Sequence, residues 1–174
     1  QLEGQQTAVD LVRRLHRDYP SLGIIVVGSR LNTEYIGELL TGGARMVPIA
    51  GEAGKPDPQL MRAHMTTATI HGVHNARPGT ISLSNVSESG TVFNPDDIAP
   101  YRALADEFRL TLHMDGARFA NAVVASGASP ADLTWRSGID CLSFGLTKNG
   151  GIAAEAVVMF DQAMACLLYT SDAA

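Results

Sequence analysis

The sequence predicts an α/β fold in which a mainly parallel sheet carries helices on both faces. Along the chain, short apolar runs rich in β-branched residues alternate with segments of helical periodicity. These runs are continuously apolar, as strands buried on both faces are, and residues 23–27 are the clearest case. The 174 residues, 45% of them hydrophobic, suit about one domain.

The predicted elements alternate in order from the N-terminus. The strands are residues 23–27, 45–49, 80–84, 110–114, 139–144 and 156–160. The helices are residues 8–15, 32–40, 57–67, 94–108, 117–125 and 131–137.

Local signals place the ends of the elements in the first half of the chain. The first helix rests on apolar residues at helical spacing, and Asn32 caps the second, which a glycine pair stops. Pro48 moves the second strand toward a sheet edge, because proline cannot donate to a ladder. Pro58 opens the third helix, where a missing N–H costs nothing.

The helix over residues 94–108 has the clearest start. Asn94 is its N-cap, Pro95 takes the first helical position, and Asp96 and Asp97 face the positive end of the helix dipole. Pro100 is expected to kink or split this helix. The last two helices and the last three strands rest on apolar periodicity alone.

Composition argues against several classes of function. A net charge of −5, with no cluster of lysines and arginines, excludes a nucleic-acid surface. No apolar run approaches the ~18 residues of a membrane helix, and no secretory signal opens the chain. The two cysteines, Cys141 and Cys166, form no C-x-x-C pair, so we expect a cytoplasmic protein without disulfides.

Both ends of the sequence suggest truncation. Gln1 is not an initiator methionine, and residues 166–174 interrupt a helical pattern that begins at residue 161. These nine residues resemble read-through of an adapter, so we expect a non-native tail there and a partial domain over residues 1–165.

Two short segments carry the chemistry. Asp115 and Arg118 follow an apolar strand, and Lys148 follows the next strand along the chain. In parallel sheets ligands bind beyond the carboxyl ends of strands, where these residues fall. A carboxylate, a guanidinium and a lone lysine suit pyridoxal phosphate: the acid pairs the pyridine nitrogen, the arginine reaches the phenolic oxygen, and the lysine forms a Schiff base with the aldehyde.

Each of these residues also has an ordinary structural explanation. Asp115 suits a helix cap, Arg118 an ion pair, and Lys148 a solvated loop. His113, in the strand before Asp115, is expected to be a core histidine or one that supports the site from behind. Although His113-x-Asp115 is half of a metal site, no further ligands follow at metal spacing, so we expect no metal.

The amino-acid sequences of several segments resemble those of the bacterial low-specificity L-threonine aldolases. These enzymes belong to the beta-eliminating lyase group of fold-type-I pyridoxal phosphate enzymes. The resemblance is carried by residues 82–93, 113–122, 129–135, 142–150 and 154–158. It implies a partial cofactor-binding large domain over residues 1–165, without the C-terminal small domain. It also implies that the parent enzyme cleaves L-threonine or L-allo-threonine to glycine and acetaldehyde and is a homo-oligomer, whereas the fragment in this sequence is expected to be inactive alone.

The resemblance also assigns roles to individual residues. Lys148 is the catalytic lysine and holds the cofactor together with Asp115 and Arg118. Arg30 stands where the family stacks a histidine on the cofactor ring. Arginine can stack on an aromatic face but cannot serve as a neutral base. The substrate side is expected to be lined by Ser84, Asn85, Ser87 and Glu88.

Two other functions remain open at this level. Another fold-type-I lyase or an aminotransferase needs the same acid, arginine and lysine. A fragment that keeps the core of the fold without catalysis is the third interpretation, and Arg30 favours it.

Overall fold

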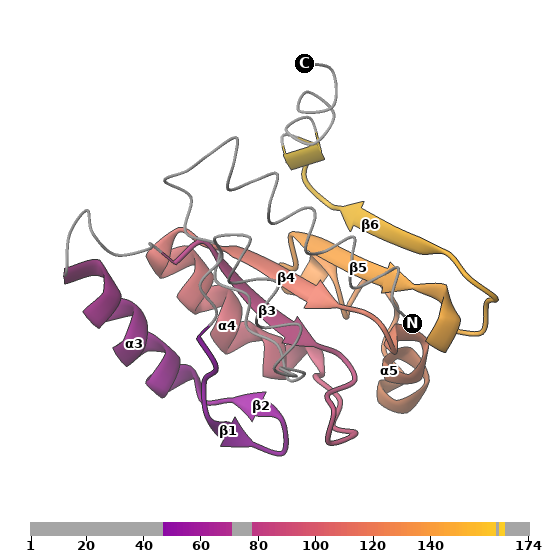
Figure 1. Cartoon of the computed structure of the whole chain (residues 1–174), viewed down its shortest axis with the longest axis horizontal. Helices are drawn as coiled ribbons and strands as arrows, with labels where there is room; N and C mark the ends of the chain where they lie inside the picture. Colours follow the sequence, from indigo (N-terminus) through magenta and orange to yellow (C-terminus); the bar gives the residue numbers. More distant parts are fainter. Residues whose placement is uncertain (1–46, 71–77, 163, 166–174) are drawn as a thin grey trace.

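The computed structural model describes residues 47–70, 78–162 and 164–165, which form a four-stranded sheet, a small hairpin and the helices around them (Figure 1). The strands are β1 (Gly51–Glu52), β2 (Lys55–Pro56), β3 (Thr80–Ser84), β4 (Thr111–Asp115), β5 (Cys141–Gly145) and β6 (Glu155–Met159). The helices are α3 (Pro58–Ile70), α4 (Pro95–Phe108) and α5 (Phe119–Ser126), with short 3-10 turns η2 (Trp135–Ser137) and η3 (Leu146–Lys148).

The sheet is mainly parallel, as predicted. Its strand order is β3-β4-β5-β6; β3, β4 and β5 run parallel, and β6 pairs antiparallel with β5. The carboxyl ends of the three parallel strands therefore meet at one edge of the sheet, which is where this architecture places ligands.

The elements with the clearest start and end signals in the sequence form where they are predicted. β3 has the predicted bounds, and α4 runs from Pro95 to Phe108 behind Asn94, whose backbone N–H donates to Asp97 at 2.9 Å. Pro100 lies inside α4 without dividing it, so the predicted split is wrong. α3 continues to Ile70, three residues past the predicted end.

Two predicted elements are wrong in the described residues. Residues 47–49 form no strand, and an unpredicted hairpin follows, in which β1 and β2 are joined by Ala53 and Gly54 at φ of 52° and 80°. Positive φ at both turn residues matches the twist that a two-residue hairpin needs. Residues 131–137 are turns ending in η2 instead of a helix, because side chains such as Thr134 and Ser137 bond to nearby backbone carbonyls.

The two faces of the sheet differ in chemistry. One face is apolar and packs on α3 and α4, which lie side by side in Figure 1. Its buried strand residues are Ile81, Leu83, Leu112, Met114 and Leu142. The opposite face carries the polar residues of the same strands, among them Ser82 and His113. The predicted helices over residues 8–15 and 32–40 lie outside the described residues.

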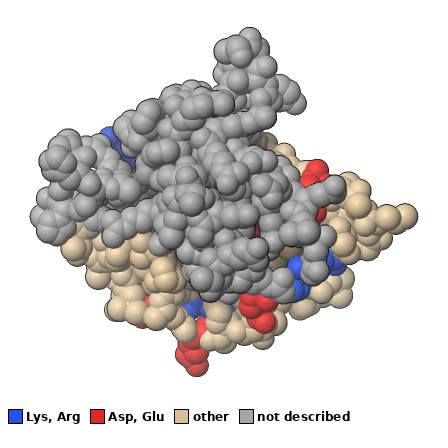
Figure 2. Space-filling view, in the orientation of Figure 1, with Lys and Arg blue, Asp and Glu red and all other residues tan. Residues whose placement is uncertain are grey.

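Charged side chains are interspersed on the described part of the face drawn in Figure 2, where acidic and basic atoms neighbour one another around the rim. That part of the surface shows no continuous basic patch of the kind that binds nucleic acid. Among the described helices, none has the length and apolar character needed to cross a bilayer.

Candidate functional site

Asp115 ends β4 at the edge of the sheet where the parallel strands finish. Its neighbours in register are Ser84 on β3 and Ser143 on β5, so these three residues share one level and one face. From Asp115 the chain turns away from the sheet, and we call residues 115–118 the acid turn. Within it, the Asp115 carboxylate accepts a hydrogen bond from the Ala117 amide at 2.9 Å, which fixes the direction of the acid.

Gly116 lets the acid turn lie directly on β5. Its amide donates to the Ser143 carbonyl at 2.7 Å. A Cβ on Gly116 would lie 2.6 Å from the Leu142 Cδ1 atom and 2.9 Å from the Ser143 carbonyl oxygen. This glycine is therefore required by close packing between the turn and the strand.

Arg118 reaches back across the sheet edge. Its guanidinium Nη1 lies 3.0 Å from the Glu88 carboxylate, and both side chains are about two-thirds to three-quarters buried. The ion pair brings together a predicted cofactor residue and a predicted substrate-side residue that lie 30 positions apart. Arg118 and Glu88 thus lie at the same edge of the sheet as Asp115.

Lys148 lies in the loop that follows β5. The chain turns through η3, which ends at Lys148, and Gly150 continues it at φ 94°, a conformation that side chains rarely adopt. We call residues 146–151 the lysine loop. Lys148 is exposed, and the hydrogen bonds and ion pairs found among the described residues include none from its amine.

Asn149 joins the lysine loop to the acid turn and was missed by the sequence analysis. Its side-chain amide donates to the carbonyls of Gly116 at 3.0 Å, Ala117 at 3.2 Å and Gly145 at 2.6 Å. Its side-chain oxygen accepts from the Ala120 amide at 2.7 Å. The residue next to Lys148 is therefore bonded directly to the segment that carries Asp115 and Arg118.

Asn85 and Ser87 build the loop after β3. The fully buried Asn85 amide donates to the Phe93 carbonyl and accepts from the Phe93 N–H, at 3.0 and 3.1 Å. The buried Ser87 hydroxyl donates to Ala53 in the hairpin and accepts from the Thr91 amide. Both polar groups thus hold this loop in place, while Ser84 and Glu88 lie nearer the acid turn through Asp115 and Arg118.

His113 lies beneath the site, on the same face as Asp115. Its Nδ1 is 2.7 Å from the Ser82 hydroxyl, and its Nε2 is 2.8 Å from the Ser143 hydroxyl. Burial lowers the pKa of His113, and the charge of Asp115 opposes this shift only in part. A neutral imidazole with both nitrogens bonded supports the site from behind, as the sequence interpretation expects.

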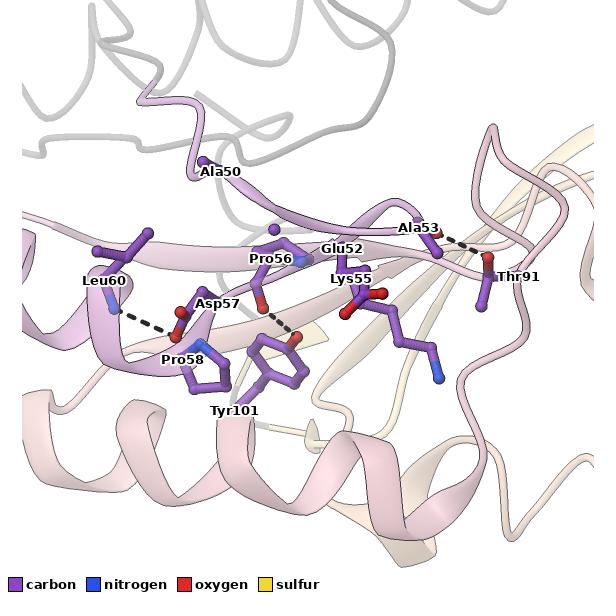
Figure 3. Close-up of a pocket in the computed structure, with 11 residues that line it drawn as sticks. Ala50, Glu52, Ala53, Lys55, Pro56, Asp57, Pro58, Leu60, Thr91 and Tyr101 are labelled. Atoms are coloured by element: carbon purple, nitrogen blue, oxygen red, sulfur yellow. Dashed lines mark hydrogen bonds between the residues drawn. The ribbon is translucent and has the colours of Figure 1, made fainter.

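Two hollows flank the hairpin. The smaller, of about 230 Å³, lies between the hairpin and β3, and Ser82, Ser84 and Glu88 form its wall toward the site. The larger, of about 620 Å³, is shown in Figure 3 and includes none of the predicted site residues.

Two polar side chains of the larger hollow, Tyr101 and Lys55, are already engaged. The Tyr101 hydroxyl donates to the Pro56 carbonyl (Figure 3), and burial, with the charges of Asp97 and Asp57, raises the pKa of Tyr101 to about 12. Lys55 pairs with Asp97 at 2.9 Å. We therefore assign no chemistry to this hollow.

Arg30 and Cys141 are the two remaining residues that the sequence singled out. Arg30 lies outside the described residues. Cys141 faces the site side of β5 as the register partner of His113, and burial together with the nearby Asp140 charge raises the pKa of its thiol to about 11. At neutral pH this thiol is protonated and a weak nucleophile.

A family model described as "Beta-eliminating lyase" matches residues 30–169. The chain is 37% identical over 128 residues to the low specificity L-threonine aldolase of Pseudomonas sp. and 38% identical over 128 residues to that of Pseudomonas aeruginosa. Each match covers 74% of this chain and 36% of the relative, so the chain spans about a third of the length of these relatives.

The fold is also similar to that of a solved structure. The Leishmania major threonine aldolase superposes with a TM-score of 0.73 at 24% identity, over 97% of this chain and 50% of the other. At this identity the likeness concerns the fold alone, and it agrees with the mainly parallel sheet described above.

Proposed function

Because the chain belongs to the beta-eliminating lyase family, we propose that its site binds pyridoxal 5'-phosphate and cleaves L-threonine or L-allo-threonine to glycine and acetaldehyde. One observation carries the proposal: Asn149 bonds the loop of Lys148 to the turn of Asp115 and Arg118. The names of the two Pseudomonas relatives support the substrate and the reaction.

The donor set of the site fits this cofactor. Asp115, held by the Ala117 amide, would keep a proton on the pyridine nitrogen, since a neighbouring carboxylate favours the charged form. Arg118 would contact the phenolic oxygen, and the exposed Lys148 amine would bind the aldehyde carbon. When bound, the cofactor supplies an electron sink for breaking the bond between the α and β carbons.

The loop after β3 would form the substrate side. Ser84 and Glu88 would contact the amino acid, and their position in the lining of the hollow of about 230 Å³ between the hairpin and β3 supports this role. Asn85 and Ser87 would act by holding this loop, because their polar groups bond to Phe93 and to the hairpin.

Arg30 distinguishes this chain from the family pattern. An arginine there would stack on the cofactor ring but would not accept a proton from the substrate. We also propose that the enzyme is a cytoplasmic homo-oligomer that takes an amino acid as its substrate. The alternative function is an aminotransferase, which would need the same acid, arginine and lysine.

The sequence contains only two lysines, Lys55 and Lys148, which makes the cofactor assignment easy to test. Pyridoxal phosphate added to the purified chain should give the absorption band of lysine-linked cofactor, and Lys148→Ala should abolish it. Lys55→Arg, which keeps the cation beside Asp97, is the matched control and should retain the band. A band that survives in Lys148→Ala would refute the assignment.

A second measurement tests the reaction. Incubation of the parent enzyme with L-threonine should release glycine and acetaldehyde in equal amounts, whereas the 174-residue chain alone is expected to be inactive. A keto acid product in place of acetaldehyde would identify an aminotransferase instead.

A further inference from the structure

Among the described residues, the Asn149 side chain makes more hydrogen bonds between the lysine loop and the acid turn than any predicted site residue does. Its four hydrogen bonds reach Gly116, Ala117, Ala120 and Gly145. Three of these partners lie 29–33 positions away, in the acid turn and the first turn of α5. The fourth, Gly145, ends β5 directly before the lysine loop.

One of these bonds replaces a missing helix cap. Arg118 takes the N-cap position of α5 but makes no capping hydrogen bond, because a guanidinium has only donors and cannot accept from a helix N–H. Ala120 is the second residue of the helix, and its N–H needs an acceptor from outside. The Asn149 side-chain oxygen supplies that acceptor from the lysine loop.

The other bonds require donors, and only an amide of this length combines both functions here. The two side-chain N–H groups of Asn149 serve three carbonyls, so one hydrogen is shared. An aspartate would keep the acceptor and lose every donor, and an alanine would lose both.

The Asn149 backbone also fixes its neighbour. Its own N–H donates to the Leu146 carbonyl at 2.9 Å and closes the 3-10 turn that ends at Lys148. A side chain held at Asn149 therefore limits the positions that the Lys148 backbone can take.

We propose that Asn149 is a positioning residue that holds the lysine loop against the acid turn, so that Lys148 reaches a cofactor bound by Asp115 and Arg118. The link to the cofactor rests on the proposed function, whereas the link between the two segments can be tested without any cofactor.

The experiment compares Asn149→Ala and Asn149→Asp with wild type and with Asn121→Ala. Asn121 is an exposed asparagine on α5, and the structure gives its side chain no hydrogen bond among the described residues, so it controls for the chemical change. Hydrogen exchange of the 174-residue chain without cofactor reports on residues 116–120 and 145–151. Far-UV circular dichroism checks that each variant is folded.

In Asn149→Ala, both segments should exchange about tenfold faster than in wild type, as expected for the loss of one or two net hydrogen bonds. In Asn149→Asp, the Ala120 amide should stay protected, because the carboxylate still caps α5, while the lysine loop should exchange faster. This variant keeps the test decisive if Asn149→Ala does not fold. Exchange in both variants equal to that of Asn121→Ala would overturn the proposal.

The second readout is the linkage to Lys148. Condensation of the Lys148 amine with the aldehyde of pyridoxal phosphate forms a C=N bond and releases water, and borohydride then reduces it to a secondary amine that mass spectrometry locates. We expect both Asn149 variants to form this product about tenfold more slowly than Asn121→Ala. Unchanged linkage rates in loosened variants would overturn the positioning role. No product in wild type would refute the proposed function, and the exchange data would still judge the contact between the segments.

Discussion

The acid turn and the lysine loop meet at the same edge of the sheet but are held there in different ways. The acid turn continues a strand with one buried face: Met114 before it is in the core, and Gly116 within it packs on Leu142 and Ser143. The lysine loop is exposed at Lys148 and Gly150, and its side-chain bonds to the acid turn come from Asn149. A substitution in the turn should therefore reduce stability, and one in the loop should reduce cofactor linkage.

The largest expected effect tests the anchoring of the acid turn. In Gly116→Ala, the new methyl group would lie closer to Leu142 and to the Ser143 carbonyl than van der Waals contact allows. Overpacking of this kind costs about 1–3 kcal/mol, so the free energy of unfolding should fall by that amount. Chemical denaturation followed by circular dichroism measures it.

Gly127→Ala is the matched control for this change. Gly127 has a φ of 66°, and an added Cβ there meets nothing within 4 Å, so only backbone strain of roughly 1 kcal/mol is expected. If Gly116→Ala proves no more destabilising than Gly127→Ala, the acid turn is not anchored by its packing on β5.

An intermediate effect concerns His113, which supports the acid turn from beneath. Burial lowers the pKa of His113 below its usual 6.5, although the Asp115 charge opposes the shift. Below about pH 6.5 the His113 imidazole is therefore protonated in the unfolded chain while it is still neutral in the folded chain. The folded state should accordingly lose stability as the pH falls below about 6.5. One such proton contributes at most about 1.4 kcal/mol per pH unit.

Replacement of the imidazole tests this assignment. His113→Gln should remove this part of the pH dependence when the free energies of unfolding at about pH 7.5 and about pH 5.5 are compared. His64→Gln, at an exposed position on α3, should leave it unchanged. An unaltered pH dependence in His113→Gln would mean that other groups cause the loss of stability.

The acid turn was also the more predictable of the two segments. Its position follows from local signals, since an apolar strand that ends in Asp115 fixes both the element and the residue at its end. The same holds for α4, whose Asn94 and Pro95 mark its start within the sequence itself. The sequence pattern groups Asp115, Arg118 and Lys148 as a candidate cofactor site, and the resemblance to a family assigns each of them an expected role.

What the sequence could not reveal depends on contacts between distant residues. The partners of Asn149 in the acid turn and α5 lie 29–33 positions away, so no local pattern distinguishes it from any other loop asparagine. The reason for Gly116 is likewise its contact with β5. The hairpin was missed because β1 and β2 have two residues each, too few to show an alternating pattern.

The smallest expected effect concerns the one part of the acid turn that is held weakly. The Arg118 side chain pairs with Glu88 near the surface, where an ion pair contributes about 0.2–1 kcal/mol and is screened by salt. Glu88→Gln should lower the free energy of unfolding by no more than this, and added salt should reduce the difference between variant and wild type. Glu107→Gln, which breaks the more exposed pair with Arg62, should have a smaller effect still. A loss in Glu88→Gln as large as that in Gly116→Ala would show that the ion pair, and not the packing of the backbone on β5, holds the acid turn in place.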